Sequence, residues 1–420
     1  MNAVTKNARI LLTGGRVLDV VEDMDRQTDV LLENGRMIAF GAEARGLPHD
    51  RVDAIDGCLV LPAFVDLCAN LREPGEKHHA TIASETRAAL AGGFAHVVTP
   101  PDTLPVVDSA AIVALIQEKA EAAGAAKVYT IGALTKGLEG KRPANMAALQ
   151  QAGCIAISNA RAGFANDETL LRCLEYAATL GLTVFFYPEE PSLANGCAHD
   201  GFMAARLGLP AIPALAETVA LAKQLLMVEE TGVRAHFSQL SCKSSVELIR
   251  IAKGKGLPVT ADVAMHQLHL TDAAIDGFNS LAHVRPPLRS EADRLALCAA
   301  VQDGTIDAIC SHHQPLNAAA KLAPFPATEP GISALETVLP LGLKLVRDGL
   351  LNEHRLWQAL TVSPATIAGI AAGSLTTGGG VVVVDPDAAW CVAPETLSSA
   401  GLNTPFLGMA VQGRVKGVYL

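Results

Sequence analysis

Three side chains that follow apolar stretches of this sequence, Cys68, His312 and His313, have types that suit metal binding or nucleophilic chemistry. Cys68 and Asn70 come after the apolar run 59–65, and two residues that lie two positions apart on an extended strand project to the same side. His312 and His313 come after a later apolar run. A thiolate and an imidazole are ligands that zinc accepts, and a thiol beside a histidine is also a candidate nucleophile. The sequence alone does not show that these side chains converge.

The elements that must position these residues follow the pattern of a barrel. From residue 59 to about residue 365, short apolar strands alternate with alanine-rich amphipathic helices. Eight strands separated by helices are typical of a (β/α)8 TIM barrel, an α/β fold in which the loops after the strands converge at one mouth. The first strand is expected within 60–67, and the other seven at 95–98, 127–131, 154–157, 183–187, 234–238, 258–263 and 306–310.

The two ends of the chain indicate a separate β structure. Residues 8 to about 58 contain short apolar strands with turns between them, and the Asn34-Gly35 pair is a strong hairpin signal. Strand character returns in Val381–Val384 and in the glycine-rich end of the chain. We therefore expect residues 1–58 and 371–420 to form the two parts of a small β-sandwich beside a barrel that spans residues 59–370.

Composition argues against several classes of protein. Half of the 420 residues are apolar and only 18% are charged, so the chain is long enough to bury a large core. The nine cysteines are scattered and include no Cys-x-x-Cys pair, which argues against a disulfide framework or a structural zinc module. A net charge of −10 without a basic block argues against nucleic-acid binding. No apolar run is long enough to span a membrane and residues 1–9 do not resemble a signal peptide, so we expect a cytoplasmic protein without membrane contact.

The segment from Asp66 to Gly75 resembles a motif of the dihydroorotases, which belong to the cyclic amidohydrolase superfamily. It reads Asp-Leu-Cys-Ala-Asn-Leu-Arg-Glu-Pro-Gly, where that family has Asp-x-His-x-His-x-Arg-Glu-Pro-Gly. In the family, the two histidines bind the catalytic metal at the end of the first barrel strand. The resemblance implies the same barrel, with its chemistry at the carboxyl ends of the strands. It runs almost end to end, with further matches at residues 133–141, 259–263, 285–289, 304–307, 331–337 and 360–365.

This chain departs from the resemblance at the positions that perform the chemistry. The two first-strand histidines are replaced by a thiol and an amide, and the histidine ligands of the fifth and sixth strands by a phenol and an amide. Two aspartates, a ligand and the general base, are replaced by asparagine and histidine. Phenols and neutral amides are poor ligands for transition metals at neutral pH. In chain order, these altered positions are Cys68, Asn70, Asn159, Tyr187, Gln239 and His312. We therefore expect no catalytic residues and no bound zinc.

The resemblance also implies a weakened substrate site. Arg72 matches the arginine that grips the substrate carboxylate, and His266 matches a further family position. Asp102 and Arg285 replace two substrate-site asparagines, and a carboxylate beside an anionic substrate disfavours binding through like-charge repulsion. We expect Arg72 to serve more as a salt-bridge partner of Glu73 or Asp102 than as a substrate clamp.

Two interpretations of the altered mouth remain open. In the simpler one, the replacement residues are inert fillers of a barrel mouth that once held metal. In the other, Cys68, His312 and His313, with His266 nearby, form a rearranged single-metal site, because the first and eighth strands are neighbours in a closed barrel.

The resemblance as a whole implies a non-catalytic role. An intact fold whose site has been removed indicates selection on another surface. The chain is similar to the inactive dihydroorotase homologues of some bacteria, which bind the catalytic chain of aspartate carbamoyltransferase in a dodecamer with equal numbers of both chains. We therefore expect a non-catalytic assembly subunit in de novo pyrimidine biosynthesis. The alternatives are a divergent amidohydrolase that acts on a cyclic amide through the rearranged metal site, and a sensor that binds a nucleotide or pyrimidine intermediate in the altered pocket.

Overall fold

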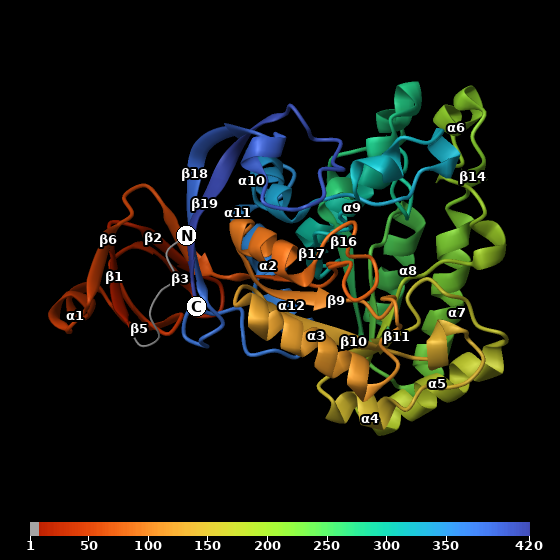
Figure 1. Cartoon of the computed structure of the whole chain (residues 1–420), viewed down its shortest axis with the longest axis horizontal. Coiled ribbons are helices and arrows are strands. Elements are labelled where there is room, and N and C mark those ends of the chain that lie inside the picture. Colours follow the sequence, from red (N-terminus) through yellow and green to blue (C-terminus); the bar gives the residue numbers. More distant parts are fainter. Residues whose placement is uncertain (1–7) are drawn as a thin grey trace.

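Eight parallel strands form a nearly closed barrel in the computed structural model, which describes residues 8–420 (Figure 1). Each strand pairs with the next in the order that the chain supplies them. This is the predicted (β/α)8 architecture. The barrel strands are β8 (Phe64–Asp66), β9 (Phe94–Thr99), β10 (Lys127–Ala133), β11 (Ala156–Ser158), β12 (Thr183–Phe186), β15 (Ala235–Phe237), β16 (Val259–Ala264) and β17 (Ala308–Cys310).

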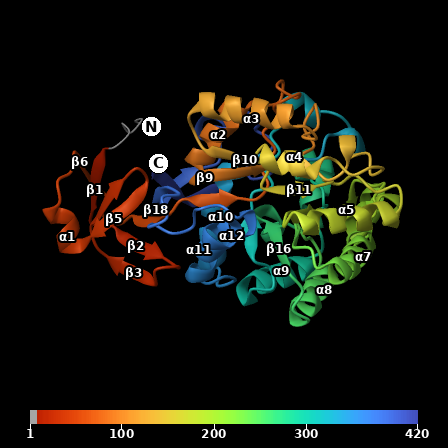
Figure 2. The same ribbon diagram turned by 90° about the horizontal axis from the view of Figure 1, so that it is seen from below.

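Helices surround the barrel strands on the outside (Figure 2). Several of these helices begin at a polar residue whose side chain accepts a hydrogen bond from a backbone amide of the first turn. The Asn166 side chain accepts a hydrogen bond from the backbone amide of Thr169, and Ser290 forms a capping box with Asp293. Among residues 8–420, no helix combines the length and the hydropathy needed to cross a bilayer. The main helices are α2 (Ile82–Ala91), α3 (Ala110–Ala123), α4 (Met146–Gln151), α5 (Asp167–Thr179), α6 (Phe202–Leu207), α7 (Leu215–Thr231), α8 (Lys243–Gly254), α9 (Glu291–Asp303), α10 (Val338–Arg347), α11 (Glu353–Leu360) and α12 (Val362–Ala368).

Two further sheets pack against each other beside the barrel, and segments from both ends of the chain build them (Figure 1). Asn34 and Gly35 both have positive φ between β4 and β5, which confirms the predicted hairpin. Buried residues from both sheets, among them Leu12, Val17 and Val381, share one core. One sheet contains β1 (Arg9–Thr13), β4 (Val30–Glu33), β5 (Arg36–Phe40) and β6 (Arg51–Ala54), and the other β2 (Arg16–Asp19), β3 (Met24–Gln27), β7 (Leu59–Pro62), β18 (Val381–Cys391) and β19 (Ala410–Tyr419).

The apolar run 59–65 is not the single strand that its hydrophobicity suggests. Its first half is β7, which pairs with β18 in the terminal sheet, and its second half is β8 of the barrel. The chain passes between the two sheets at Ala63, whose amide bonds Gly380 O, while the amide of Phe64 bonds Gly93 O. Both halves are buried, so the hydrophobic pattern is continuous although the pairing partners change.

The first and eighth barrel strands are joined through the residues that follow them. The amide of Asn70 donates to the carbonyl of His313 over 2.8 Å, and the amide of His313 donates to the carbonyl of Cys68 over 3.2 Å. The amide of Ser311 donates to Asp66 Oδ1 over 2.7 Å. The barrel therefore closes at the segments that the sequence singles out for chemistry.

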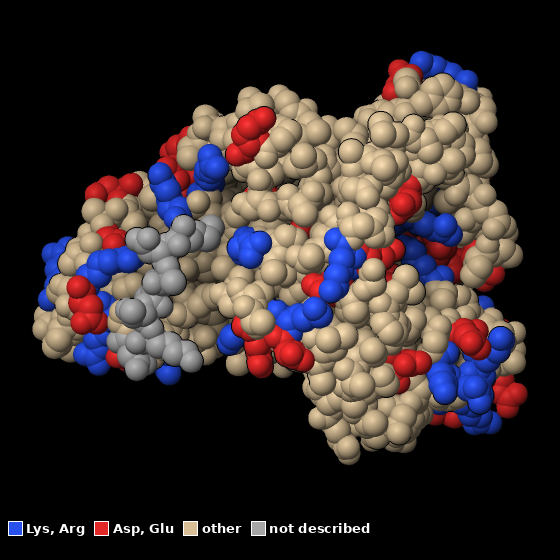
Figure 3. All heavy atoms as spheres, in the orientation of Figure 1, with Lys and Arg blue, Asp and Glu red and all other residues tan. Residues whose placement is uncertain are grey.

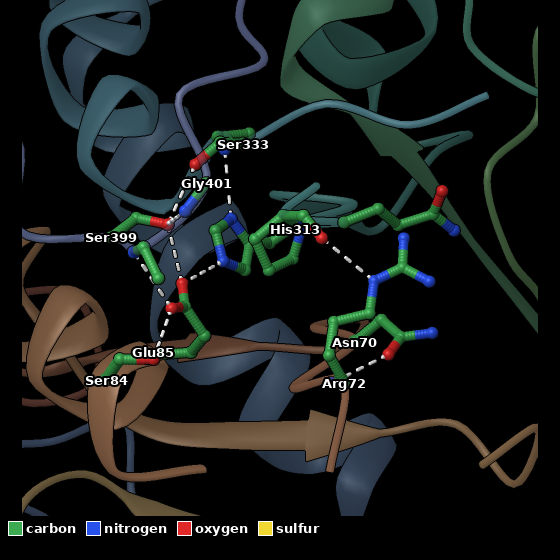
Figure 4. A network of polar contacts seen from close by, with 12 residues as sticks. Asn70, Arg72, Ser84, Glu85, His313, Ser333, Ser399 and Gly401 are labelled. Atoms are coloured by element: carbon green, nitrogen blue, oxygen red, sulfur yellow. Dashed lines mark hydrogen bonds and ion pairs between the residues drawn. The ribbon is translucent and has the colours of Figure 1, made fainter. Parts of the chain in front are cut away.

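A buried carboxylate, Glu85 on α2, ties this closure to the segment between β18 and β19 (Figure 4). Its Oε2 lies 2.7 Å from His313 Nε2 and accepts a bond of 2.6 Å from the Ser399 hydroxyl. Its Oε1 accepts bonds from the Ser84 hydroxyl and the amide of Ala400. Although burial opposes ionisation, the His313 contact and these hydroxyls lower the pKa of Glu85 to about 2.

Replacement of Glu85 by glutamine should therefore destabilise the protein at neutral pH. The folded pKa of about 2 lies below the ordinary value of 4.5, so the stabilisation is fully present above pH 4.5 and is lost as the pH falls toward 2. We expect Glu85→Gln to lower the free energy of unfolding by about 3 kcal/mol at pH 7. Urea unfolding checks this. The exposed Glu121→Gln variant is the control. A difference from wild type that stays constant from about pH 5 to pH 3 would contradict the account.

Candidate functional site

Three of the altered positions meet at the carboxyl ends of the barrel strands. Cys68 follows β8, Tyr187 follows β12 and Gln239 lies just after β15. Gln239 Nε2 donates to Cys68 Sγ over 2.9 Å, and the Tyr187 hydroxyl lies 3.7 Å from the same sulfur. All three side chains are buried. The mouth thus brings these residues together, as the sequence predicts, but they bond to one another.

The Cys68 thiol is held in its neutral form. Burial raises its pKa well above the usual range, and the nearby carboxylates Asp66 and Asp262 raise it further. Burial likewise raises the pKa of the Tyr187 hydroxyl well above its ordinary value. The thiolate is the form of cysteine that attacks substrates and binds metals. In this neutral form Cys68 is poorly suited to act as a nucleophile.

Arg161 completes this group, and sequence reasoning missed it. Its Nη2 donates to Gln239 Oε1, its guanidinium carbon lies 5.6 Å from the centre of the Tyr187 ring, and its Nη1 is 3.8 Å from Glu189 Oε2. It follows Asn159 by two residues in a loop, and neither its type nor its spacing in the sequence marks it as part of the mouth.

The side chain of Asn159 bonds Thr135 and its own loop. Its Nδ2 donates to the carbonyl of Ala162 over 3.0 Å and to the carbonyl of Gly163 over 3.3 Å. Its Oδ1 accepts a hydrogen bond from the Thr135 hydroxyl. A carboxylate has no hydrogen to donate to either carbonyl. The amide at this position therefore has a structural role that an aspartate cannot fill.

His266 and His312 form a buried, neutral pair. Their ring centres are 5.6 Å apart and both residues are 1% exposed. Burial lowers the pKa of His266 to about 3 and that of His312 well below its usual value. Within residues 8–420, none of their four ring nitrogens has a hydrogen-bond partner. This pair lies among the charges of the mouth, since Arg161 and Arg72 also lower the pKa of His312.

The rearranged metal site proposed from the sequence is not assembled. His313 directs its Nε2 to Glu85, and its Nδ1 accepts a bond from the amide of Ala334, so this ring does not face Cys68. In the described part of the chain, no three or more His, Cys, Asp or Glu side chains are grouped so that they could hold a metal ion. A zinc site needs several anionic or imidazole donors directed at one point. The donors present here do not fit a divalent ion.

Arg72 is paired with a residue that the sequence did not indicate. Its Nη1 donates to Glu76 Oε2 over 2.8 Å and its Nε to the carbonyl of Pro315 over 3.0 Å. The expected hydrogen-bonded pairing with Glu73 or Asp102 is wrong. Glu73 instead bonds the amide of Ile82 and two lysines, while Asp102 interacts with Arg72 only through its charge. A turn closed by the bond from the amide of Glu76 to the carbonyl of Arg72 brings the two side chains together.

The other two substrate-site replacements are also present at the mouth. Arg285 makes a two-pronged contact with Glu189, in which Nε and Nη2 each donate over 2.8 Å, and Nη2 also bonds the carbonyl of Ala194. The side chain of Asp102 is exposed to solvent. Desolvation by the protein groups that surround its carboxylate nevertheless raises its pKa. Asn70 accepts a bond from the amide of Arg72, which fixes the first-strand loop.

Backbone strain is concentrated at this mouth. Four residues other than glycine have positive φ here: Arg72 at 61°, Ala160 at 48°, Gln239 at 60° and His312 at 51°. They follow β8, β11, β15 and β17. Such conformations cost about 1–3 kcal/mol each and are typical of functional sites. Strained backbone is therefore found after four of the eight barrel strands.

The contacts of Asn159 predict the effect of restoring a carboxylate there. We expect Asn159→Asp to destabilise the protein by about 2–4 kcal/mol, because it sets a buried charge against two carbonyl oxygens. Urea unfolding measures the loss, and Asn166→Asp is the matched control because aspartate also caps a helix well. An Asn159→Asp protein as stable as wild type that binds one equivalent of zinc would overturn this reading.

Comparisons with known proteins agree with the fold and identify the family. A family model described as Dihydro-orotase-like matches residues 57–245. A dihydroorotase-like protein of Pseudomonas putida is 50% identical over 410 residues, which cover 97% of this chain and 96% of that protein. A dihydroorotase of Trichlorobacter lovleyi is 38% identical over 408 residues, 96% of each chain.

Among solved structures, L-hydantoinase (dihydropyrimidinase) from Arthrobacter aurescens superposes with a TM-score of 0.87. The alignment covers 97% of this chain and 94% of that one at 21% sequence identity, so this likeness supports the fold alone. The sequence relatives extend over nearly the whole chain at much higher identity. The chain belongs to the dihydroorotase-like family.

Proposed function

We propose that this chain is a catalytically inactive dihydroorotase homologue that serves as a structural subunit of the aspartate carbamoyltransferase holoenzyme in pyrimidine biosynthesis. The observation that carries the first half of the proposal is the set of bonds among Cys68, Tyr187 and Gln239. These residues stand where the resemblance places metal ligands. Their polar groups are used within the protein, so we expect neither bound zinc nor a metal-activated water.

The groups that would recognise a substrate are also used within the protein. Arg72 is paired with Glu76, and Arg285 with Glu189. A substrate carboxylate would have to displace a carboxylate of the protein from either arginine. This competition, together with the negative charge of Asp102, disfavours dihydroorotate and carbamoyl aspartate.

The second half of the proposal, the partner, rests on the resemblance to inactive homologues and is consistent with the surface. On the face shown in Figure 3, lysine and arginine are interspersed with aspartate and glutamate, which gives no continuous basic patch for nucleic acid. Three large apolar side chains are strongly exposed on the segments that connect barrel strands to the helices outside: Phe202, the first residue of α6, at 75%, Phe278 at 52% and Leu322 at 82%.

These three residues lie on segments that contact one another. Arg206 bonds Asp276 over 2.7 Å, and the Ser280 hydroxyl bonds the carbonyl of Lys321 over 2.8 Å. Exposed apolar groups that gather on one surface are typical of protein interaction sites. The Phe202, Phe278 and Leu322 surface is therefore the part of the chain that we expect the transferase to contact.

The test is the solution mass of this chain alone and mixed with the aspartate carbamoyltransferase chain of the same cell, with transferase activity read on the same fractions. We expect a dodecamer with equal numbers of both chains, and transferase activity that depends on it. The double variant Phe202→Ser/Leu322→Ser should fold normally and weaken the complex at least about tenfold. Absence of any complex with the wild-type chain would refute the partner assignment.

One observation favours a second candidate, a divergent amidohydrolase that acts on a cyclic amide. The four strained residues at the mouth keep a costly backbone form that an inert scaffold does not need. On this reading, the neutral His266 and His312 rings would be available to a substrate, since their nitrogens have no partner in the described chain. Substitution of either histidine would then abolish turnover, whereas the scaffold proposal expects no turnover to lose.

A further inference from the structure

Arg161 lies in the barrel mouth between a carboxylate, an amide oxygen and an aromatic ring, which are three groups that attract a guanidinium ion. Its guanidinium donates to Gln239 Oε1, lies over the Tyr187 ring at 5.6 Å and approaches Glu189 Oε2 at 3.8 Å. Tyr187 and Gln239 are altered ligand positions, and both of them contact the third, Cys68. Arg161 therefore contacts Tyr187 and Gln239 directly, and both of these residues contact Cys68.

The surroundings of this cation are negative or electron-rich. Glu189 has a side chain that is 7% exposed, and Asp102 is close enough for Arg161 to lower its pKa. The face of a phenol ring attracts a cation, most strongly when water is excluded. Arg161 itself is only 23% exposed at its side chain. Arg161 therefore adds a positive charge beside Glu189, which Arg285 also contacts through two hydrogen bonds.

We propose that the barrel mouth is a guanidinium-binding site that the chain fills with its own Arg161, a fixed cation standing among the altered positions where the family has metal ligands. The site takes a planar cation with donors on two sides. One nitrogen donates to Gln239, another lies 3.8 Å from Glu189 Oε2, and the guanidinium carbon lies over the Tyr187 ring. A lysine ammonium lacks this fork and flat face, so arginine is specifically required. This inference does not depend on the identity of any partner.

The neighbouring cavity makes the site accessible to a small molecule. A cavity of 290 Å³ is lined by Arg161 itself and by Tyr187, Glu189 and Lys223. Truncation of Arg161 to alanine would join the vacated space to this cavity. A free alkylguanidinium ion could then enter from the cavity and restore the same contacts.

Chemical rescue tests the proposal. We expect Arg161→Ala to lower the melting temperature by about 3 °C, and millimolar ethylguanidinium to recover at least about half of this loss. Urea is planar and of similar shape but carries no charge, so at the same concentration it should recover nothing. Wild type should not be stabilised by either compound, because its site is already filled.

Two variants serve as controls. Arg161→Met keeps most of the side-chain volume without charge, so it should lose stability but show no rescue. Arg172→Ala removes an exposed arginine that pairs with Glu175 on α5, and should show neither loss nor rescue. Equal responses of Arg161→Ala to ethylguanidinium and to urea would overturn the proposal.

A measurement on the wild-type protein covers the case in which Arg161→Ala does not fold. Nitrogen-15 NMR of arginine side chains should show a guanidinium with slowed rotation about its Cζ–Nε bond that disappears in Arg161→Met. If every slowed guanidinium signal of wild type remains in Arg161→Met, Arg161 is mobile and the proposal fails.

Discussion

The backbone hydrogen bonds that join residues 68–70 to His313 close the barrel, and the geometry of the whole mouth depends on them. These bonds fix where Cys68 and His312 lie relative to the ends of the other strands. Glu85 stabilises these backbone bonds, because it bonds both the His313 ring and the hydroxyl of Ser399. Since the closing residues belong to the strands that carry altered positions, the fold can be kept only if those positions remain well packed and hydrogen-bonded.

That constraint explains why the side chains at the altered positions of the barrel mouth are held by hydrogen bonds within the protein. A buried polar group without a partner costs about 1–3 kcal/mol, so each replacement needs a new partner. Gln239 bonds Cys68, Asn159 bonds the carbonyls of its own loop, and Arg161 supplies a positive charge beside Glu189. The rings of His266 and His312 have no such partner in the described chain, and they remain neutral because burial lowers their pKa values. The site is thus mostly satisfied internally rather than open for ligands.

The sequence was a good guide to the strands and a weaker one to the loops. The predicted barrel strands overlap the observed ones, because alternation of buried strands and helices follows directly from hydrophobicity. The same signal failed at residues 59–65, where two sheets bury one continuous run. Cys68, Tyr187 and Gln239 could be placed at one mouth by topology alone. The pairing of Arg72 with Glu76, the turn of His313 toward Glu85 and the role of Arg161 could not, since loop conformation sets the direction of those side chains.

The most direct test of the account is the rate at which the purified chain converts dihydroorotate and carbamoyl aspartate, measured with and without added zinc. The account predicts no conversion above that of heat-denatured protein in either condition, because Tyr187 and Gln239 are bonded to Cys68 and His313 is bonded to Glu85. Zinc-dependent conversion that is abolished by Cys68→Ser would contradict it, since such a result requires Cys68 to leave its bond with Gln239 and act as a metal ligand.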